Sequence, residues 1–130
     1  MKIVVDAMGG DHAPAAVVEG AVLAAREYNT KIILTGLRER IQAELDKHDP
    51  DHTLPIEIVH AEQIVEMHDI PGKALRSKKK SSMKVGLDLV KQGVGAAFLS
   101  AGNTGAVLAY STVILRPVKG VDRPAIAIQL

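Results

Sequence analysis

The chain has 130 residues and suits one domain, since a chain of this size buries about two-thirds of the surface that it exposes when unfolded. Hydrophobic residues make up 47% of the sequence but aromatic residues only 2%, a composition typical of parallel strands covered by helices. The formal net charge is +1 and cysteine is absent. These features exclude disulfides, thiolate nucleophiles and cysteine-based zinc sites, and they give no overall field that would attract nucleic acid or an anionic membrane.

The first residues are typical of a buried strand rather than of a targeting segment. Met1 leads into Lys2-Ile3-Val4-Val5, a short apolar run that ends at Asp6. No stretch approaches the ~18 apolar residues that a membrane span requires, and no signal-peptide pattern is present. We therefore expect a soluble protein of the cytoplasm, a compartment with which the absence of cysteine is compatible.

The first half of the chain alternates strands with helices. Strands are predicted over residues 2–6, 31–35 and 56–59, and helices over residues 14–28 and 37–47. In the first helix, Val18 and Val22 are four positions apart and give an apolar face; Ile41 and Leu45 do the same in the second. Asp49-Pro50 ends the second helix, because a residue before proline disfavours the helical region.

The second half continues the alternation after a less regular segment. Residues 60–80 are predicted to be irregular, with a turn at Pro71-Gly72. A helix is then predicted to end near Gln92-Gly93, with Ser81 or Ser82 as its N-cap. A strand over 96–99, a largely apolar helix that ends near Leu115 and a fifth strand over 125–130 follow.

This order of elements predicts an α/β fold, with a parallel sheet that is covered on both faces through right-handed crossovers. The last predicted strand has no helix after it, which leaves part of the sheet uncovered. We therefore interpret residues 1–130 as a fragment of a longer protein.

Two glycine-containing loops form the candidate site. Residues 6–11 and 100–105 each follow the carboxyl end of a strand and lead into a helix, so we expect both loops to face one crevice. Glycine lets a ligand approach the backbone, and free amides at a helix N-terminus favour phosphate or an oxyanion. Asn103 and Thr104 add side-chain donors there. The candidate phosphate-binding residues of the loops are Asp6, Gly9, Gly10, Asp11, His12, Ser100, Gly102 and Gly105.

The loops also have a simpler interpretation as capped turns. Asn103 or Thr104 would then cap the second helix. Asp11 or His12 would lie near the start of the first, and Asp6 would fix its loop instead of facing a ligand. Neither loop carries a dinucleotide-binding or P-loop pattern. The five histidines show no metal-site spacing, so we predict no metal and no cofactor.

Basic residues concentrate in one stretch of the chain. They are Lys73, Arg76, Lys78, Lys79, Lys80 and Lys84. In a chain of net charge +1 this run predicts a local positive patch for an acidic partner or a phosphate-bearing ligand, and a solvated surface loop explains it equally. No aromatic residue interleaves with the cations to stack on bases, so nucleic acid is not an expected partner.

Five segments together resemble the PlsX family, the phosphate acyltransferases that act on acyl carrier protein (ACP) thioesters. They are Asp6-Ala7-Met8-Gly9-Gly10-Asp11; Ala74-Leu75-Arg76-Ser77-Lys78 with Ser81-Ser82-Met83; Leu87-Asp88-Leu89-Val90-Lys91-Gln92-Gly93; Ser100-Ala101-Gly102-Asn103-Thr104-Gly105-Ala106; and Arg116-Pro117 with Gly120-Val121-Asp122-Arg123-Pro124-Ala125. The first and the fourth are the most specific. The resemblance covers the whole chain, but members of the family are considerably longer, which implies that residues 1–130 are the N-terminal portion of a single larger α/β catalytic domain whose C-terminal half is absent.

The resemblance implies a three-layer α/β/α fold with a mostly parallel sheet, like that of isocitrate and isopropylmalate dehydrogenases and related to phosphotransacetylases, in a homodimer. It implies that inorganic phosphate attacks a long-chain acyl-ACP to form acyl-phosphate for phospholipid synthesis. A membrane glycerol-3-phosphate acyltransferase then uses this product, and members are cytoplasmic and peripherally membrane-associated. Asn103 and Thr104 would supply catalytic donors, while Arg76 and Lys78 would hold phosphate or the acidic surface of the carrier.

The residues by themselves leave other functions open. A phosphotransacetylase-like enzyme would act on short acyl-CoA, and a non-enzymatic module would only bind a phosphate-bearing ligand. A nucleotide-dependent dehydrogenase is the least favoured, since no acidic residue for the adenine ribose follows the first glycine turn at the expected spacing.

Overall fold

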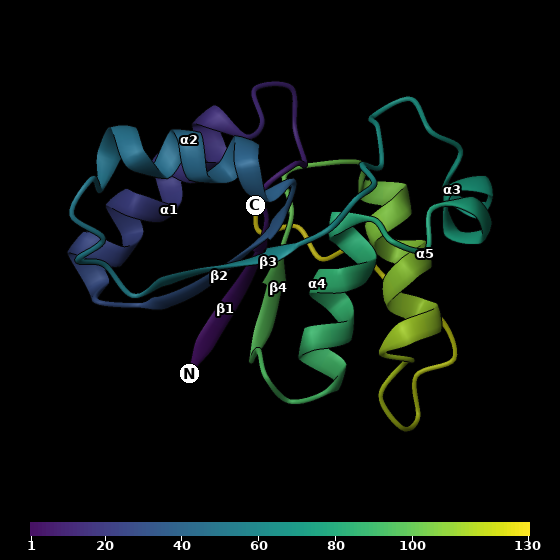
Figure 1. Cartoon of the computed structure of the whole chain (residues 1–130). Coiled ribbons are helices and arrows are strands. Elements are labelled where there is room, and N and C mark those ends of the chain that lie inside the picture. The colour runs from purple at the N-terminus through teal and green to yellow at the C-terminus, as the bar shows by residue number, and fades with distance from the viewer.

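The computed structural model describes residues 1–130 and confirms the α/β class. Its elements are β1 (Lys2–Asp6), α1 (Ala15–Tyr28), β2 (Lys31–Gly36), α2 (Arg38–His48), β3 (Ile56–His60), α3 (Pro71–Ser77), α4 (Ser82–Lys91), β4 (Ala97–Leu99) and α5 (Thr104–Ile114). Figure 1 shows the sheet between α1 and α2 on one side and α3, α4 and α5 on the other. None of the helices combines the length and the apolar composition needed to cross a bilayer.

The sheet has four parallel strands in the order β3-β2-β1-β4. β1 is an inner strand, with Val5 in register with Leu34 of β2 and with Leu99 of β4. Both faces of such a strand are covered, which explains the continuous apolar run in β1. Because β1 and β4 are parallel neighbours, their carboxyl ends meet at the same edge, and the loops that follow them start side by side.

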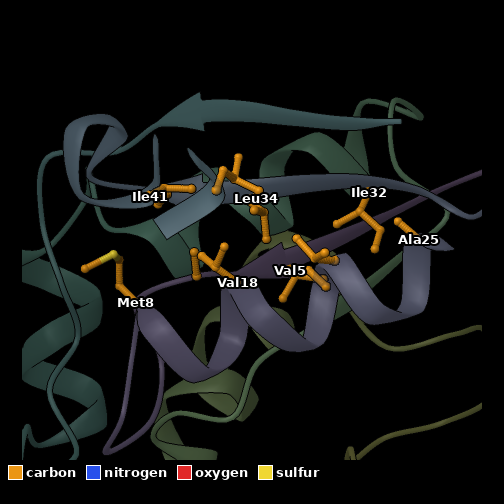
Figure 2. Close-up of a cluster of buried hydrophobic side chains, with 11 residues drawn as sticks. Val5, Met8, Val18, Ala25, Ile32, Leu34 and Ile41 are labelled. Atoms are coloured by element: carbon orange, nitrogen blue, oxygen red, sulfur yellow. The ribbon is translucent and has the colours of Figure 1, made fainter. Parts of the chain in front are cut away.

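One face of the sheet packs against α1 and α2 through a cluster of 11 buried residues. In Figure 2, Val18 and Ala25 of α1 point toward Val5 and the neighbouring strand. Ile41 and Leu45 of α2 join the same cluster. The apolar faces predicted for both helices are therefore confirmed. Their burial holds α1 and α2 against this face of the sheet.

The opposite face packs against α4, which approaches the strands closely at a glycine. A Cβ added at Gly86 would lie 2.5 Å from Cε2 of Phe98. α5 packs on α4, and α3 packs on α5 at the edge of the molecule (Figure 1). A second cluster of seven buried residues, among them Met83, Leu87 and Tyr110, joins these helices. Helices thus flank both faces of the sheet, as a three-layer α/β/α fold requires.

The region before α4 is more regular than its sequence suggested. Residues 71–77 form α3, so the predicted turn at Pro71-Gly72 is wrong. Pro71 occupies the first turn of the helix, where its missing N–H removes no hydrogen bond. Ser81 is the N-cap of α4, and its Oγ accepts a hydrogen bond from Lys84 N at 3.1 Å. One of the two serines was expected in that role.

The predicted fifth strand over 125–130 does not form. Residues 121–130 are exposed, and no backbone hydrogen bond joins residues 122–130 to the rest of the chain. An alternating apolar sequence becomes a strand only when it pairs with an edge, and β4 pairs with β1 alone. Beside β4, an apolar groove of about 560 Å³ lies open between α1 and the sheet.

Candidate functional site

The two glycine loops touch at the carboxyl edge of the sheet. A Cβ added at Gly102 would lie 3.1 Å from Gly9 Cα, and one added at Gly9 would lie 2.7 Å from Ser100 Oγ. Gly10 adopts a φ of 109°, a region that glycine favours, and lies against Ala101. The expected convergence of the two loops is confirmed, and glycine is what permits so close an approach.

Asp6 fixes the first loop to the second and to α4. Its side chain is 2% exposed and accepts hydrogen bonds from Met8 N at 3.1 Å, Ser82 Oγ at 2.6 Å and Ser100 Oγ at 2.9 Å. Ser100 Oγ also accepts a bond from Gly102 N at 3.1 Å. Of the two roles considered for Asp6, the structure displays the loop-fixing one, because neutral donors of the protein surround the carboxylate.

The start of α5 presents backbone amides beside these loops. Asn103 is the N-cap, in agreement with the simpler interpretation of this loop as a capped turn, and its Oδ1 accepts a hydrogen bond from Ala106 N at 3.1 Å. The amides of Thr104 and Gly105 precede this first capped amide, and both residues are exposed. No side-chain hydrogen bond engages the Thr104 hydroxyl. The site therefore offers free donors at the positive end of a helix dipole.

The amide group of Asn103 is engaged by the turn before α3. Nδ2 donates to Asp69 O at 2.9 Å, Glu66 O at 3.2 Å and Met67 O at 3.3 Å, and the residue is 8% exposed. Asn103 therefore ties α5 to residues 66–69. These contacts leave its amide no free donor in the present arrangement, in contrast to the hydroxyl of Thr104.

Lys78 also holds this turn, and neither of its side-chain hydrogen bonds reaches the glycine loops. Its ammonium group forms an ion pair with Asp69 and donates to Ile64 O at 2.7 Å. The hydrogen bond from Lys78, followed by one from Glu66 N, holds the pKa of Asp69 below its ordinary value. Lys78 thus has a structural partner within the chain.

Three other candidate residues lie apart from the contact between the loops. Asp11 and His12 are exposed, and no side-chain hydrogen bond joins either to residues 100–105. Neither side chain caps α1, whose N-cap residue is Pro14. Arg76 is exposed on α3 and makes no ion pair within the chain. The structure therefore brings together Asp6, Gly9, Gly10 and residues 100–105, and leaves these three at the periphery.

Several residues that shape the site were not singled out for it by sequence reasoning. Ser82 was considered only as a helix cap, although it bonds to Asp6. Pro71 borders the start of α5, because a Cβ added at Gly105 would lie 2.9 Å from Pro71 Cγ. Asp69 could have been recognised from the sequence, because an acidic residue just before the basic run is a candidate ion-pair partner for one of its lysines. No three or more His, Asp or Glu side chains form a group that could hold a metal ion.

Comparison with known proteins places the chain in a family. A family model described as "Fatty acid synthesis protein" matches residues 1–130. The chain belongs to this family. The match includes both glycine loops, the basic run and the segment after α5, so it extends over every segment on which the resemblance to PlsX was based.

Curated relatives of this chain are named phosphate acyltransferases. That of Geobacter sulfurreducens is 52% identical over 127 residues, which cover 98% of this chain and 36% of the relative. The relative from an Anaeromyxobacter species is 50% identical over 124 residues, which cover 95% of this chain and 34% of the relative. The Clostridioides difficile protein is 49% identical over 126 residues, which cover 97% of this chain and 37% of that relative. The resemblance is confirmed, and the chain spans about a third of the length of these relatives.

Proposed function

We propose that the full-length protein carrying this sequence is a phosphate acyltransferase that forms acyl-phosphate from long-chain acyl-ACP and inorganic phosphate. The observation that carries the proposal is the contact between the two glycine loops, which places the free amides of α5 beside backbone that a ligand can approach. The names of the relatives support it independently.

Phosphate would bind at the start of α5. The amides of Thr104 and Gly105 and the helix dipole favour a dianion, and the exposed Thr104 hydroxyl adds a donor. Gly9 and Gly10 would let the anion reach the backbone of the first loop, because neither carries a side chain. Arg76, Lys78, Asp11 and His12 are the proposed peripheral contacts to phosphate or to the carrier.

The reaction requires positioning more than proton removal, since a substantial fraction of inorganic phosphate is already the dianion near neutral pH. A phosphate oxygen attacks the thioester carbonyl carbon, an oxyanion forms, and the C–S bond then breaks. The released thiolate takes up the proton that phosphate loses and becomes the thiol, so atoms and charges balance. A donor aimed at the oxyanion is typically worth ~3 kcal/mol, or a factor of ~10²–10³ in turnover.

Asn103 and Thr104 are the proposed donors, and the structure distinguishes them. Thr104 can donate without rearrangement. Direct donation by Asn103 requires its amide to leave the carbonyl groups of residues 66–69. Asn103 would otherwise contribute as a positioning residue that fixes the start of α5.

The proposal extends to the wider properties of the PlsX type. The parallel sheet flanked by helices supports a fold like that of isocitrate and isopropylmalate dehydrogenases. The length of the relatives supports residues 1–130 as the N-terminal portion of one larger catalytic domain. We also propose a homodimer in the cytoplasm with peripheral membrane association, which supplies acyl-phosphate to a membrane glycerol-3-phosphate acyltransferase.

Transfer of labelled phosphate into an acyl-phosphate tests the activity. The full-length protein should label the product with palmitoyl-ACP as donor. Labelling with acetyl-CoA but not with palmitoyl-ACP would indicate a phosphotransacetylase-like enzyme instead, and binding of phosphate without transfer from any donor would indicate a binding module.

Substitutions at the start of α5 assign the donors in the same assay. Thr104→Val should lower kcat by ~10²-fold without changing the unfolding midpoint. Asn103→Ser keeps an oxygen for the cap but removes the amide, so it should lower turnover and stability together. Thr112→Val, a matched change later in α5, should leave turnover unaltered. Full activity of Thr104→Val would remove this hydroxyl from the mechanism.

A further inference from the structure

The outer face of α3 and the turn before it combine exposed apolar and basic side chains. Met67 and Ile70 are 51% and 57% exposed. Lys73 and Arg76 are three residues apart on α3 and therefore share one helical face, and Lys79 follows the helix; all three are exposed. We call these five residues the α3 surface. Figure 1 shows α3 at the edge of the molecule, beside α5 and away from the sheet.

The cations of the α3 surface have no acidic partner within the chain. The other basic residues of the run are paired, Lys78 with Asp69, Lys80 with Glu62 at 3.8 Å and Lys84 with Asp88 at 2.5 Å. No ion pair of the chain involves Lys73, Arg76 or Lys79. With a formal net charge of +1, the chain therefore carries a local surplus of positive charge that attracts an acidic surface.

Short contacts join the α3 surface to the glycine-loop site. Pro71, which follows Ile70, lies against Gly105 at the start of α5. Asn103 donates to the backbone carbonyl of Met67 at 3.3 Å. A molecule bound on the α3 surface would therefore lie next to the amides where phosphate is proposed to bind, and a group carried on a flexible arm could reach them.

We propose that the α3 surface docks an acidic carrier protein that presents its acyl thioester to the glycine loops, an inference that rests on the proposed function. The surface fits an amphipathic helix whose apolar side chains cover Met67 and Ile70 while its carboxylates face the three cations. A lipid surface fits less well, because residues 60–84 contain no Trp, Tyr or Phe of the kind that anchors proteins at a membrane interface.

Calorimetric titration of the full-length protein with palmitoyl-ACP tests whether the carrier docks on the α3 surface. Lys73→Glu/Lys79→Glu leaves Arg76, a candidate phosphate contact, in place. This double variant should raise Kd about tenfold at 0.05 M salt. The effect should shrink at 0.5 M salt, because screening then acts within a few ångströms. Met67→Ser should raise Kd by a few-fold at both salt concentrations, since it removes apolar contact area.

The matched control reverses two exposed charges elsewhere. Arg40 on α2 and Lys119 after α5 form no ion pair, and Arg40→Glu/Lys119→Glu should leave Kd unaltered. An equal Kd for Lys73→Glu/Lys79→Glu and the parent would overturn the docking site. The docking site would also be overturned if Lys73→Glu/Lys79→Glu lost binding to phosphatidylglycerol vesicles but kept its affinity for palmitoyl-ACP. Binding that depends on the α3 surface without acyl-phosphate formation would support the docking site and refute the proposed function.

Discussion

At the scale of single residues, the contact between the loops depends on a buried carboxylate and on glycines. Asp6 is the common acceptor for Ser82 and Ser100, which come from separate parts of the chain. Its removal would leave buried hydroxyl groups without an acceptor, a cost of about 1–3 kcal/mol. Gly9 lies directly over this group, so any side chain there would displace both loops.

Gly9→Ala tests how strictly this contact excludes a side chain. Its Cβ would lie 2.7 Å from Ser100 Oγ, 2.8 Å from Asp6 Oδ2 and 3.0 Å from Gly102 N. We expect a loss of about 1–3 kcal/mol of unfolding free energy in urea titrations, as for other overpacked sites.

Gly20→Ala is the matched control for that experiment. Position 20 lies within α1 and has no atom within 4 Å of an added Cβ. Alanine there should stabilise the protein by about 0.5–1 kcal/mol, since it favours a helix over glycine. Equal stability of the two variants would show that the loops yield to a methyl group.

At the scale of elements, α3 depends on its neighbours. A helix of seven residues is not stable in isolation, because nucleation costs more than so few hydrogen bonds return. Tyr110 of α5 is fully buried, and its hydroxyl contacts Ala74 O at 2.8 Å and Lys78 O at 2.7 Å. A tyrosine hydroxyl is protonated at neutral pH and can donate here, and burial raises the pKa of Tyr110 further above its ordinary value.

Tyr110→Phe should therefore loosen α3 more than the sheet. Loss of the hydroxyl removes the hydrogen bonds to Ala74 O and to the partly buried Lys78 O and should cost about 1–3 kcal/mol. Hydrogen exchange should show reduced protection in residues 71–78 with smaller changes in β1 and β2. Tyr28→Phe, at a position that is 69% exposed, should have no measurable effect. Uniform loss of protection across the chain would contradict this view of α3.

At the scale of the whole molecule, folding stability is linked to pH through two aspartates. The pKa of Asp69 is lowered chiefly by its hydrogen bond with Lys78. Burial works against ionisation of Asp49, but hydrogen bonds from Thr53 and Leu54 outweigh it and lower the pKa of that group as well. Both carboxylates therefore bind protons less readily in the folded chain than in the unfolded one.

Acidification should consequently destabilise the fold. The stabilisation is complete above the ordinary aspartate pKa of about 3.9 and is lost as pH falls through the lowered folded-state values. Asp69→Asn should be less stable than the parent at pH 7 and should lose less stability between pH 7 and pH 3, as measured by urea unfolding. Asp122→Asn, at an exposed position outside the helices and strands, should follow the parent curve. An unchanged acid dependence in Asp69→Asn would argue against the Lys78 pair as its source.

Local sequence patterns predicted most of the elements and the position of the candidate site. The apolar spacing of Val18 and Val22 identified the buried face of α1, and the glycine loops were recognised from their place after β1 and β4. Local sequence patterns did not predict α3, since a short segment with Pro71 and Gly72 carries little helical signal of its own. The packing of Tyr110 against it depends on residues far apart in sequence.

The sequence by itself determined the alternation of parallel strands and helices, because hydrophobic periodicity and capping act within a few residues. It also determined that two glycine loops lie at one edge of the sheet, since parallel topology brings the carboxyl ends of the strands there, whereas the pairing of β1 with β4 came from the tertiary structure. Only the tertiary structure decided that Asp6 fixes the loops, that the Asn103 amide holds the turn before α3, and that residues 125–130 remain unpaired. Hydrogen bonds between distant segments and the pairing of a strand edge depend on three-dimensional partners, which no local pattern specifies.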